Sequence, residues 1–600
     1  MRRPLLLPLL AACLLAACAT ATGNLSYSVP DQPEGASGIT AKPGWATTKF
    51  AVAAANPLAT DAGYQVLKAG GSAVDAAIAV QMVLTLVEPQ SSGIGGGAFL
   101  LHYDGREVEA FDGRETAPAA ADERLFLGSD GKPIPFYEAV VGGRSVGTPG
   151  TVRLLEAAHR AHGKLPWATL FQPAITLAEQ GFKVSPRLHT LAKADAHLKK
   201  DPTAAAYFFG ADGEPHPVGH VLRNPELAAV LRRIANEGAR AFYEGEVARA
   251  IVDKVQRHPT NPGRLAMGDL ASYQPKKRAP LCHGYRAHGR DFSICGFPPP
   301  SSGAIAVGQI LGILNQTDAP TLQLRDGLPG ADFLHLYTEA SRLAFADRAQ
   351  YVADPDFVQP PGGSWMSLLA PDYLAQRARL IQPAGPSMKT ATAGTPGRVA
   401  TSHAPMPEQP EYGTSHISIV DGFGNAIAMT TTIEDQFGAR QMVKGFLLNN
   451  ELTDFSFAPA DAQGQPVANR VQPGKRPRSS MAPTLVFDKA TGQLLMTGGS
   501  PGGALIIHFT AKTVLGVLNW GLTPQQAIDL PNFASLNGPS LLEEKRFPPA
   551  TVEALRARGA EVREQALTSG LQAITLGNAH GTPVLLGGAD PRREGIVMGD

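Results

Sequence analysis

Two kinds of hydrophobic periodicity alternate along most of the chain. From Asn56 to Val87 the apolar side chains follow a helical period that Gly70-Gly71 interrupts, and a glycine-dense turn follows at Gly93 to Gly97. Strand-like and helix-like stretches then alternate to about residue 381, and they alternate again from Leu494 to Asp600. The pattern predicts a chain of mixed helices and strands with a large apolar core.

One internal stretch carries no hydrophobic period. Residues 382–413 are dominated by proline, alanine, glycine, serine and threonine, which is the composition of a linker. The linker separates a body of residues 46–381 from a second segment of residues 414–600. The first part of that second segment, to about Asp488, is rich in strand-forming residues. We therefore expect two folded segments joined by an extended linker.

The first eighteen residues have the three parts of a secretory signal peptide. Arg2-Arg3 supplies the positive start, Leu5 to Leu15 form a short apolar run, and Ala16-Ala17-Cys18 is a small-residue exit. The exit resembles the bacterial lipobox, in which the cysteine carries a lipid, and an ordinary exported protein cleaved nearby is the alternative. Residues 19–45 have the composition of a tether. The signal peptide therefore predicts an exported, periplasmic protein, and by the same resemblance Ala19 after the cysteine favours a lipid anchor at the outer membrane.

Charge and cysteine content limit the partners to expect. Lysine plus arginine and aspartate plus glutamate both total 53, so the chain has no net charge that would attract nucleic acid. Beyond the leader no stretch reaches 18 consecutive apolar residues, so membrane contact is expected only through the N-terminal lipid. Cys282 and Cys295 are the only cysteines outside the leader, and in an oxidising compartment a disulfide between them is plausible.

A β-hairpin is predicted directly after the linker. Two runs rich in β-branched residues bracket the turn residues 421–425. A pairing symmetric about Phe423 places Thr432 opposite Thr414. A threonine pair across two strands is common in sheets and need carry no function. Cleavage of the Gly413-Thr414 bond, however, would give a threonine whose own α-amine, with an ordinary pKa of about 7.7–8.0, can act as a base for its hydroxyl.

Several motifs taken together resemble one enzyme family. They lie in that family's order across about residues 46–600 and are Glu88-Pro-Gln-Ser-Ser-Gly-Ile-Gly-Gly-Gly97, Gly113-Arg-Glu-Thr-Ala-Pro118, Pro298-Pro-Pro-Ser-Ser-Gly303, Tyr412-Gly-Thr-Ser-His-Ile-Ser-Ile-Val-Asp421, Phe446-Leu-Leu-Asn-Asn450, Asp454-Phe-Ser456, Lys475-Arg-Pro-Arg-Ser-Ser-Met481 and Gly499-Ser-Pro-Gly-Gly503. In these motifs the chain is similar to the γ-glutamyltransferases, N-terminal-nucleophile hydrolases that cleave glutathione and other γ-glutamyl compounds. The resemblance implies an α+β fold, a four-layer αββα sandwich, and a precursor that cuts itself before Thr414.

The resemblance also implies roles for individual residues. The implied catalytic residues are Thr414 as nucleophile, Thr432 as the group that holds and polarises its hydroxyl, and Gly502 and Gly503 as backbone donors to an oxyanion. The implied ligands of the donor are Arg114, Ser479 and Ser480 for its α-carboxylate and Glu434, Glu451 and Asp454 for its α-ammonium. No cofactor or metal is implied. The expected partners are γ-glutamyl donors, amino acid or dipeptide acceptors, and the large and small chains that form a heterodimer.

Alternatives remain open at this stage. Ser500 lies in a G-x-S-x-G pattern typical of serine esterases, but Pro501 lacks the N–H that such a site requires. A β-lactam side-chain acylase would share the nucleophile but would not need acids for an ammonium, and a poly-γ-glutamate depolymerase would share the donor group. A non-enzymatic envelope protein would tolerate Thr414→Ala. Glu434, at a position where members of the family have asparagine or glutamate, leaves the balance between hydrolysis and transpeptidation open.

Overall fold

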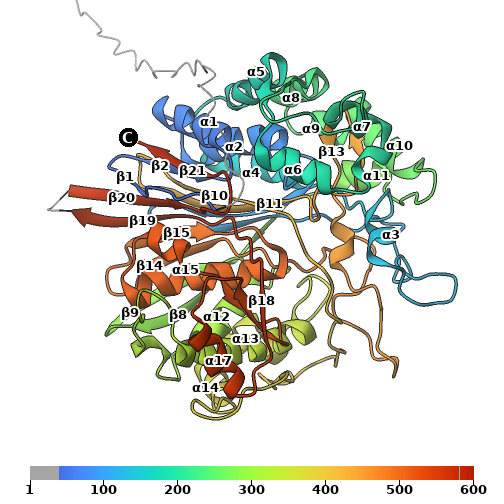
Figure 1. Cartoon of the computed structure of the whole chain (residues 1–600). Coiled ribbons are helices and arrows are strands. Elements are labelled where there is room, and N and C mark those ends of the chain that lie inside the picture. Colours follow the sequence, from blue (N-terminus) through green and yellow to red (C-terminus); the bar gives the residue numbers. More distant parts are fainter. Residues whose placement is uncertain (1–26, 28–38, 580–581) are drawn as a thin grey trace, which may run out of the picture.

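Two seven-stranded antiparallel sheets lie face to face at the centre of the molecule, between layers of helices (Figure 1). The structure is a computed structural model that describes residue 27 and residues 39–579 and 582–600. The predicted signal peptide and most of the predicted tether lie outside the described residues. The expected arrangement of four layers, helices, sheet, sheet and helices, is present in the described part of the chain.

Both sheets combine strands from the two sides of the linker. The first sheet contains, in spatial order, β21 (Ile596–Gly599), β2 (Ala51–Ala54), β10 (Ser415–Val420), β11 (Ala426–Thr432), β3 (Gly97–Tyr103), β4 (Val108–Gly113) and β7 (Lys276–Arg278). The second contains β1 (Trp45–Thr47), β20 (Thr582–Ala589), β19 (Gln572–Ala579), β15 (Leu494–Gly499), β14 (Thr484–Asp488), β9 (Arg290–Gly296) and β8 (Leu281–Ala287). The segments before and after the linker therefore share one core.

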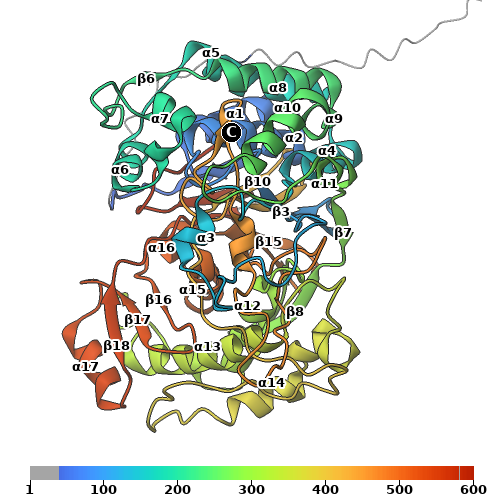
Figure 2. The ribbon, with the colours of Figure 1, turned by 90° about the vertical axis from the view of Figure 1, so that its right-hand side faces the viewer.

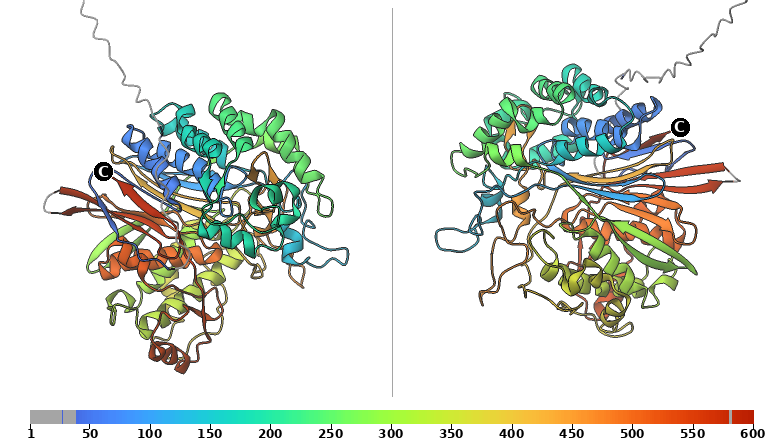
Figure 3. Two further views of the ribbon diagram at one scale, coloured as in Figure 1. Left: turned by 45° about the horizontal axis from the view of Figure 1, so that its top comes forward. Right: turned by 180° about the vertical axis from the view of Figure 1, so that it is seen from behind.

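The pleat of the first sheet directs side chains alternately to two cores. Ile417 and Ile419 belong to the core beneath the outer helices, whereas Val420 and Ala428 belong to the core shared with the second sheet. The helices on the first sheet include α1 (Pro57–Lys68), α2 (Ala73–Val87), α4 (Thr151–His162), α5 (Gln172–Gln180), α8 (Pro225–Glu237) and α10 (Gly245–Gln256). Those on the second include α12 (Gly303–Leu314), α13 (Ala331–Tyr351) and α15 (Ile506–Trp520) (Figure 2). Figure 3 shows the sheets between these layers from two further sides.

The helical pattern near the start of the body forms two helices, as predicted. Asn56 caps α1 by accepting a hydrogen bond from the N–H of Leu58. Ser72 and Asp75 form a capping box at the start of α2. Gly70-Gly71 lies in the turn between the two helices, which confirms the predicted interruption.

Two stretches show where the sequence pattern reaches its limit. The expectation of strands up to Asp488 is wrong for the described residues 448–483, which form a 3₁₀ helix, η6 (Glu451–Asp454), within irregular chain rich in proline and polar residues. The linker contains neither helix nor strand in its described residues 382–413. It is nevertheless bound to α13, because the N–H of Gly394 donates to Asp347 at 2.8 Å and the N–H of Met406 donates to the carbonyl oxygen of Ala349 at 2.9 Å.

A disulfide joins the two strands at one edge of the second sheet. Cys282 on β8 lies directly opposite Cys295 on β9, and their sulfur atoms are bonded. The structure therefore contains the disulfide that the sequence made plausible. Within residues 39–579 and 582–600, no helix combines the length and the apolar character needed to cross a membrane.

Candidate active site

The hairpin after the linker has the predicted register. β10 and β11 pair symmetrically about Phe423, with Ser415 opposite Thr431. Thr414 lies one residue before β10, and its Oγ1 donates a hydrogen bond to Oγ1 of Thr432 at 3.1 Å. Both threonines are buried. The prediction that their two hydroxyls meet is confirmed.

The backbone at the end of the linker is strained. Gly413 has φ +68° and Thr414 has φ +94°. Because a β-branched residue rarely adopts positive φ, the conformation of Thr414 costs of order 1–3 kcal/mol. Gly413 leaves no room for a side chain, since a Cβ there would lie 1.7 Å from the carbonyl oxygen of Glu434. The N–H of Thr414 donates to the carbonyl oxygen of Ser91 at 3.2 Å, so both sides of the link are fixed.

Glu434 reaches the site from a turn rather than from a strand. β11 ends at Thr432, and Glu434, with φ +74°, lies beyond the strand. Its N–H donates to Oγ1 of Thr432 at 2.9 Å, which fixes the hydroxyl that accepts from Thr414. Its carboxylate accepts from the side-chain amide of Asn450 and from the N–H of Tyr412. The same residue therefore contacts the threonine pair through its N–H and belongs to the group of buried carboxylates through its side chain.

Arg114 pairs with two of the other predicted ligands. It directly follows β4, and only 1% of its side chain is exposed. Its guanidinium forms ion pairs with Glu451 and Asp454 and donates to the carbonyl oxygens of Pro477 and Arg478 at 3.1 and 2.9 Å. Burial by itself lowers the pKa of Arg114, but the neighbouring carboxylates outweigh it and raise the pKa above its ordinary value. Three predicted ligands therefore form one ion-paired group.

The buried carboxylates around Arg114 outnumber its single positive charge. Burial, and then Asp454 and other neighbouring carboxylates, raise the pKa of Glu434 well above its ordinary value, and burial likewise raises the pKa values of Glu451 and Asp454. Within the described residues, Oε2 of Glu451 and Oδ1 of Asp454 accept no hydrogen bond. Buried Glu115, which the sequence reasoning missed although it directly follows Arg114, adds a further acid. Because unpartnered buried carboxylates are costly, this group is suited to bind a cation.

One of the two predicted serines, Ser480, bonds to a linker carboxylate. Oγ of Ser480 donates to Glu411 at 2.6 Å, and Nη2 of Arg348 donates to Ser480 at 2.5 Å and to Glu411 at 2.8 Å. Oγ of Ser479 instead accepts from the N–H of Met481 at 3.1 Å. The sequence reasoning missed Glu411 and Arg348. Arg348 carries no distinct signal in the sequence, because α13 also contains the buried charged residues Glu339, Arg342 and Asp347.

All predicted site residues except Gly502 line one small cavity. The cavity measures about 10 Å³, which is room for about one water molecule, and Thr414 and Gly503 form part of its wall. Gly502 lines a neighbouring cavity of about 820 Å³, together with residues 408–413 of the linker. Both glycines have positive φ and precede α15, Gly503 within a short 3₁₀ turn. The linker thus lies between the threonine pair and the larger cavity.

The hydroxyl of Ser500, the alternative nucleophile, holds backbone groups together. It is fully buried, and its hydroxyl donates to the carbonyl oxygen of Pro501 at 2.8 Å and accepts from the N–H of Gly570 at 3.3 Å. A serine nucleophile needs a base that accepts its proton, whereas both partners of this hydroxyl are backbone groups. The geometry therefore does not favour the esterase alternative.

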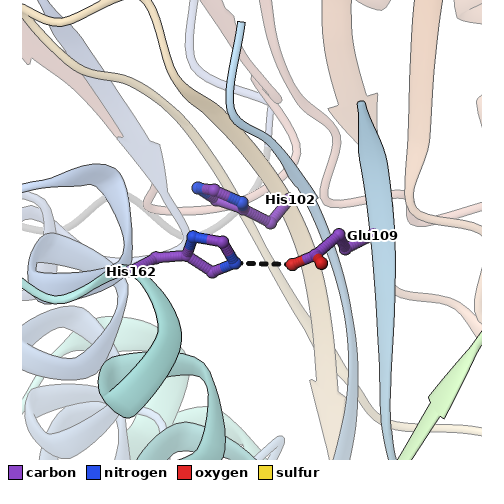
Figure 4. Close-up of side chains that lie close together, drawn as sticks. All are labelled: His102, Glu109 and His162. Carbon is purple, nitrogen blue, oxygen red and sulfur yellow. Dashed lines mark hydrogen bonds and ion pairs between the residues drawn. The ribbon is translucent and has the colours of Figure 1, made fainter. Parts of the chain in front are cut away.

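A separate group of two histidines and a glutamate lies where strands β3 and β4 of the first sheet meet the end of α4 (Figure 4). His102 on β3 is opposite Glu109 on β4, which pairs with His162 at the end of α4 at 2.5 Å and with Lys277. The two imidazole rings stack with centroids 3.9 Å apart and planes 29° apart. Nitrogen lone pairs lie in the ring planes, so nearly parallel rings do not direct them to one point. Together with the Lys277 ammonium, this geometry favours an ion-paired cluster over a metal site.

Comparisons with known proteins agree with the motifs. A family model described as gamma-glutamyltranspeptidase matches residues 59–600. The glutathione hydrolase proenzymes of Bacillus subtilis (strain 168) and Escherichia coli (strain K12) are 37% and 35% identical, over 91% and 90% of both chains. The crystal structure of cephalosporin acylase from Bacillus halodurans superposes with a TM-score of 0.80 at 27% identity, covering 96% of this chain and 98% of that one. The chain therefore belongs to the γ-glutamyltranspeptidase family.

Proposed function

We propose that the chain is a precursor that cuts its own Gly413-Thr414 bond and then transfers γ-glutamyl groups from glutathione and related compounds to water or to an amino acid or dipeptide acceptor. The observation that carries the proposal is the 3.1 Å contact between the hydroxyls of Thr414 and Thr432 at the strained end of the linker. Family membership supports it, because relatives at 35–37% identity are glutathione hydrolase proenzymes.

In the first reaction, Oγ1 of Thr414 attacks the carbonyl carbon of Gly413. The peptide C–N bond breaks, the nitrogen takes up the hydroxyl proton, and an ester joins Gly413 to Oγ1. Water then hydrolyses the ester and leaves a large chain that ends at Gly413 and a small chain that begins at Thr414. Because scission releases the constraint that holds φ of Thr414 at +94°, relief of strain favours the products.

In the second reaction, the freed α-amine of Thr414 accepts the proton of its own hydroxyl. Oγ1 attacks the γ-carbonyl carbon of the donor, and the hydrogen bond to Thr432 orients it. The backbone N–H groups of Gly502 and Gly503 stabilise the oxyanion. The leaving amine takes the proton, and water or an acceptor amine then attacks the γ-glutamyl ester. The cycle restores the free threonine.

The charges around the cavity fit a γ-glutamyl donor. Its α-ammonium would complete the bonding of the carboxylates of Glu434, Glu451 and Asp454, two of which have unpartnered oxygens. Its α-carboxylate would bind on the side of Ser479 and Ser480. A glutaryl group has the same carbon chain and carboxylate without the ammonium, so the acidic group favours γ-glutamyl donors over the substrates of side-chain acylases.

Denaturing gel electrophoresis with N-terminal sequencing tests the proposal. At 63.0 kDa over 600 residues, cleavage before Thr414 predicts pieces of roughly 42 and 20 kDa, the smaller beginning Thr-Ser-His. Thr414→Ala should leave one uncut chain without activity toward γ-glutamyl-p-nitroanilide. An uncut wild-type chain that turns over this substrate would refute the mechanism.

Export and lipid anchoring at Cys18 are part of the same proposal. The Cys282–Cys295 disulfide supports an oxidising compartment such as the periplasm. Fractionation of cells that express the full chain is the test. We expect the protein in the membrane fraction, and we expect Cys18→Ser to move it out of that fraction.

A further inference from the structure

We infer that Arg593 is a positioning residue for the nucleophile: it holds the main chain of Thr414 in place, and after cleavage its positive charge keeps the new α-amine of Thr414 in the neutral form that accepts a proton. The inference rests on the proposed function. It adds to that function a residue that acts on the base rather than on the substrate.

The main chain of Thr414 lies beyond the strand ladders that fix the rest of β10. β10 pairs with β11 from Ser415 onward and with β2 only further along the chain. The carbonyl oxygen of Thr414 instead accepts a hydrogen bond from Nη1 of Arg593 at 3.4 Å. Neither this contact nor the hydroxyl contact with Thr432 involves the bond to Gly413 that is broken. The two contacts together therefore hold the nucleophile of the cleaved enzyme.

Arg593 is itself held by its surroundings. It lies in the turn between β20 of the second sheet and β21 of the first, where its N–H donates to the carbonyl oxygen of Asp590 at 3.2 Å. Its side-chain stem packs over Gly570, and a Cβ on that glycine would lie 2.7 Å from Cδ of Arg593. Only 6% of Arg593 is exposed. A guanidinium fixed in this way can keep the carbonyl oxygen of Thr414 in one position.

The charge of Arg593 has no direct partner. Within residues 39–579 and 582–600 its guanidinium forms no ion pair, and its Nε has no hydrogen-bond partner. By contrast, the buried Arg592 next to it pairs with Glu543 and Asp590. Burial, and then the charge of Arg187, lower the pKa of Arg593 to about 9, although nearby carboxylates oppose the change. Because unpaired buried charge is costly, an arginine that carries it beside a nucleophile is a candidate for function.

The charges around Thr414 favour an ammonium unless Arg593 opposes them. The acids packed around Thr414 and Arg593 are Glu88, Glu115, Glu411, Glu434, Asp435, Glu451, Asp454, Asp590 and Glu594. The other charged or titratable side chains there are Arg114, Arg187, Arg348, Tyr412 and Arg478, together with His416, which is neutral because burial lowers its pKa to about 3. Carboxylates stabilise a nearby ammonium, whereas a cation destabilises it. Among the cations of the described chain, Arg593 is the one that bonds to Thr414 itself.

Arg593 is close enough to act on the amine. The carbonyl oxygen that accepts from Arg593 and the amine nitrogen belong to the same residue, and standard bond lengths place these two atoms at most about 3.6 Å apart. Nη1 of Arg593 therefore lies within about 7 Å of the amine. A unit charge at that distance in a partly buried site changes a pKa by about one to two. Because only the neutral amine can take the proton of Oγ1, the charge of Arg593 widens the pH range of catalysis toward acid.

The pH dependence of kcat at saturating donor tests this role. With γ-glutamyl-p-nitroanilide and no acceptor, kcat of the cleaved enzyme should fall on the acid side as the amine takes up a proton, whereas the carboxylates that bind the donor act on KM. Arg593→Gln keeps a hydrogen-bond donor but loses the charge, so we expect this fall to occur about one to two pH units higher. Arg593→Lys keeps the charge and should move the fall back toward its wild-type position.

Arg342→Gln is the matched control. Arg342 is also a buried arginine whose pKa burial lowers, but it pairs with Glu339 and donates to residues 538 and 540, away from the site. Its replacement should leave the acid side of the profile where it is. The leaving group of this substrate has no carboxylate, so recognition of such a group cannot imitate the shift. If Arg593→Gln lowered kcat equally at every pH, Arg593 would only maintain structure, and the inference would be overturned.

A second measurement needs no variant of Arg593. Cyanate carbamylates only the neutral form of an amine, and mass spectrometry of the first peptide of the small chain follows the reaction at Thr414. In the folded, cleaved enzyme we expect an apparent pKa no higher than the ordinary value of about 7.7–8.0, which the enzyme unfolded in guanidinium chloride should show. A higher value in the folded enzyme would mean that the acids prevail and would overturn the inference. An uncut wild-type chain would have no such amine and would instead refute the proposed function, so the two failures are distinguishable.

Discussion

Replacing Gly413 with alanine should slow self-cleavage by at least about a hundredfold without unfolding the protein. The new Cβ would lie 1.7 Å from the carbonyl oxygen of Glu434, whereas real Cβ contacts are not shorter than 3.0 Å, so the scissile link must move by about 1.3 Å. A displacement of about 1 Å can cost a reacting pair about a hundredfold in rate. Alanine at φ +68° also adds about 1–2 kcal/mol of strain, which scission would relieve. We expect displacement to dominate, because strain helps only when Oγ1 of Thr414 can reach the carbonyl carbon.

The assay follows the uncut chain on denaturing gels over hours after synthesis, with circular dichroism to confirm folding. Gly464→Ala is the matched control, because Gly464 has φ +79° and a Cβ there would meet nothing within 4 Å. It carries a similar strain without the clash and should leave cleavage unchanged. If folded Gly413→Ala were cleaved at the wild-type rate, the contact with Glu434 would not position the scissile bond, and the expected effect of displacement would be wrong.

Three further predictions concern the threonine pair, the acids and the disulfide. Thr432→Val should slow cleavage about ten- to a hundredfold on a gel time course, since it removes the partner of the nucleophile and leaves a buried N–H unpaired, at a cost of about 1–3 kcal/mol. The KM for a γ-glutamyl donor should rise as pH falls, because burial raises the pKa values of Glu434 and Asp454 and the protonated carboxyls no longer attract an ammonium. A flat KM–pH profile would contradict this prediction. Cys282→Ser should lower the unfolding temperature in calorimetry, by the loss of about 3 kcal/mol, yet leave the cleavage rate unchanged, whereas loss of cleavage would give the disulfide a role in the site.

The parts of the site that follow from local chain geometry were predictable, and the parts that depend on packing between distant segments were not. Strand period and turn symmetry sufficed to place Thr432 opposite Thr414, because both depend on about twenty consecutive residues. The resemblance placed Glu434 at the site, whereas the turn that carries it, with φ +74°, does not follow from the strand period. The contact of Arg348 with Glu411 joins the last turn of α13 to a linker without any hydrophobic period, and no repeat in either segment encodes that docking.

The strand order of the first sheet has a consequence for the two products of cleavage. β2, from the part of the chain before the cut, is hydrogen-bonded on one side to β21 and on the other to β10, both from the part after it. In this sheet, a strand of the large chain would thus lie between two strands of the small chain. Pulling them apart would mean breaking a continuous ladder in its middle, so the heterodimer should be inseparable without global unfolding, and separately produced halves should not assemble by simple docking.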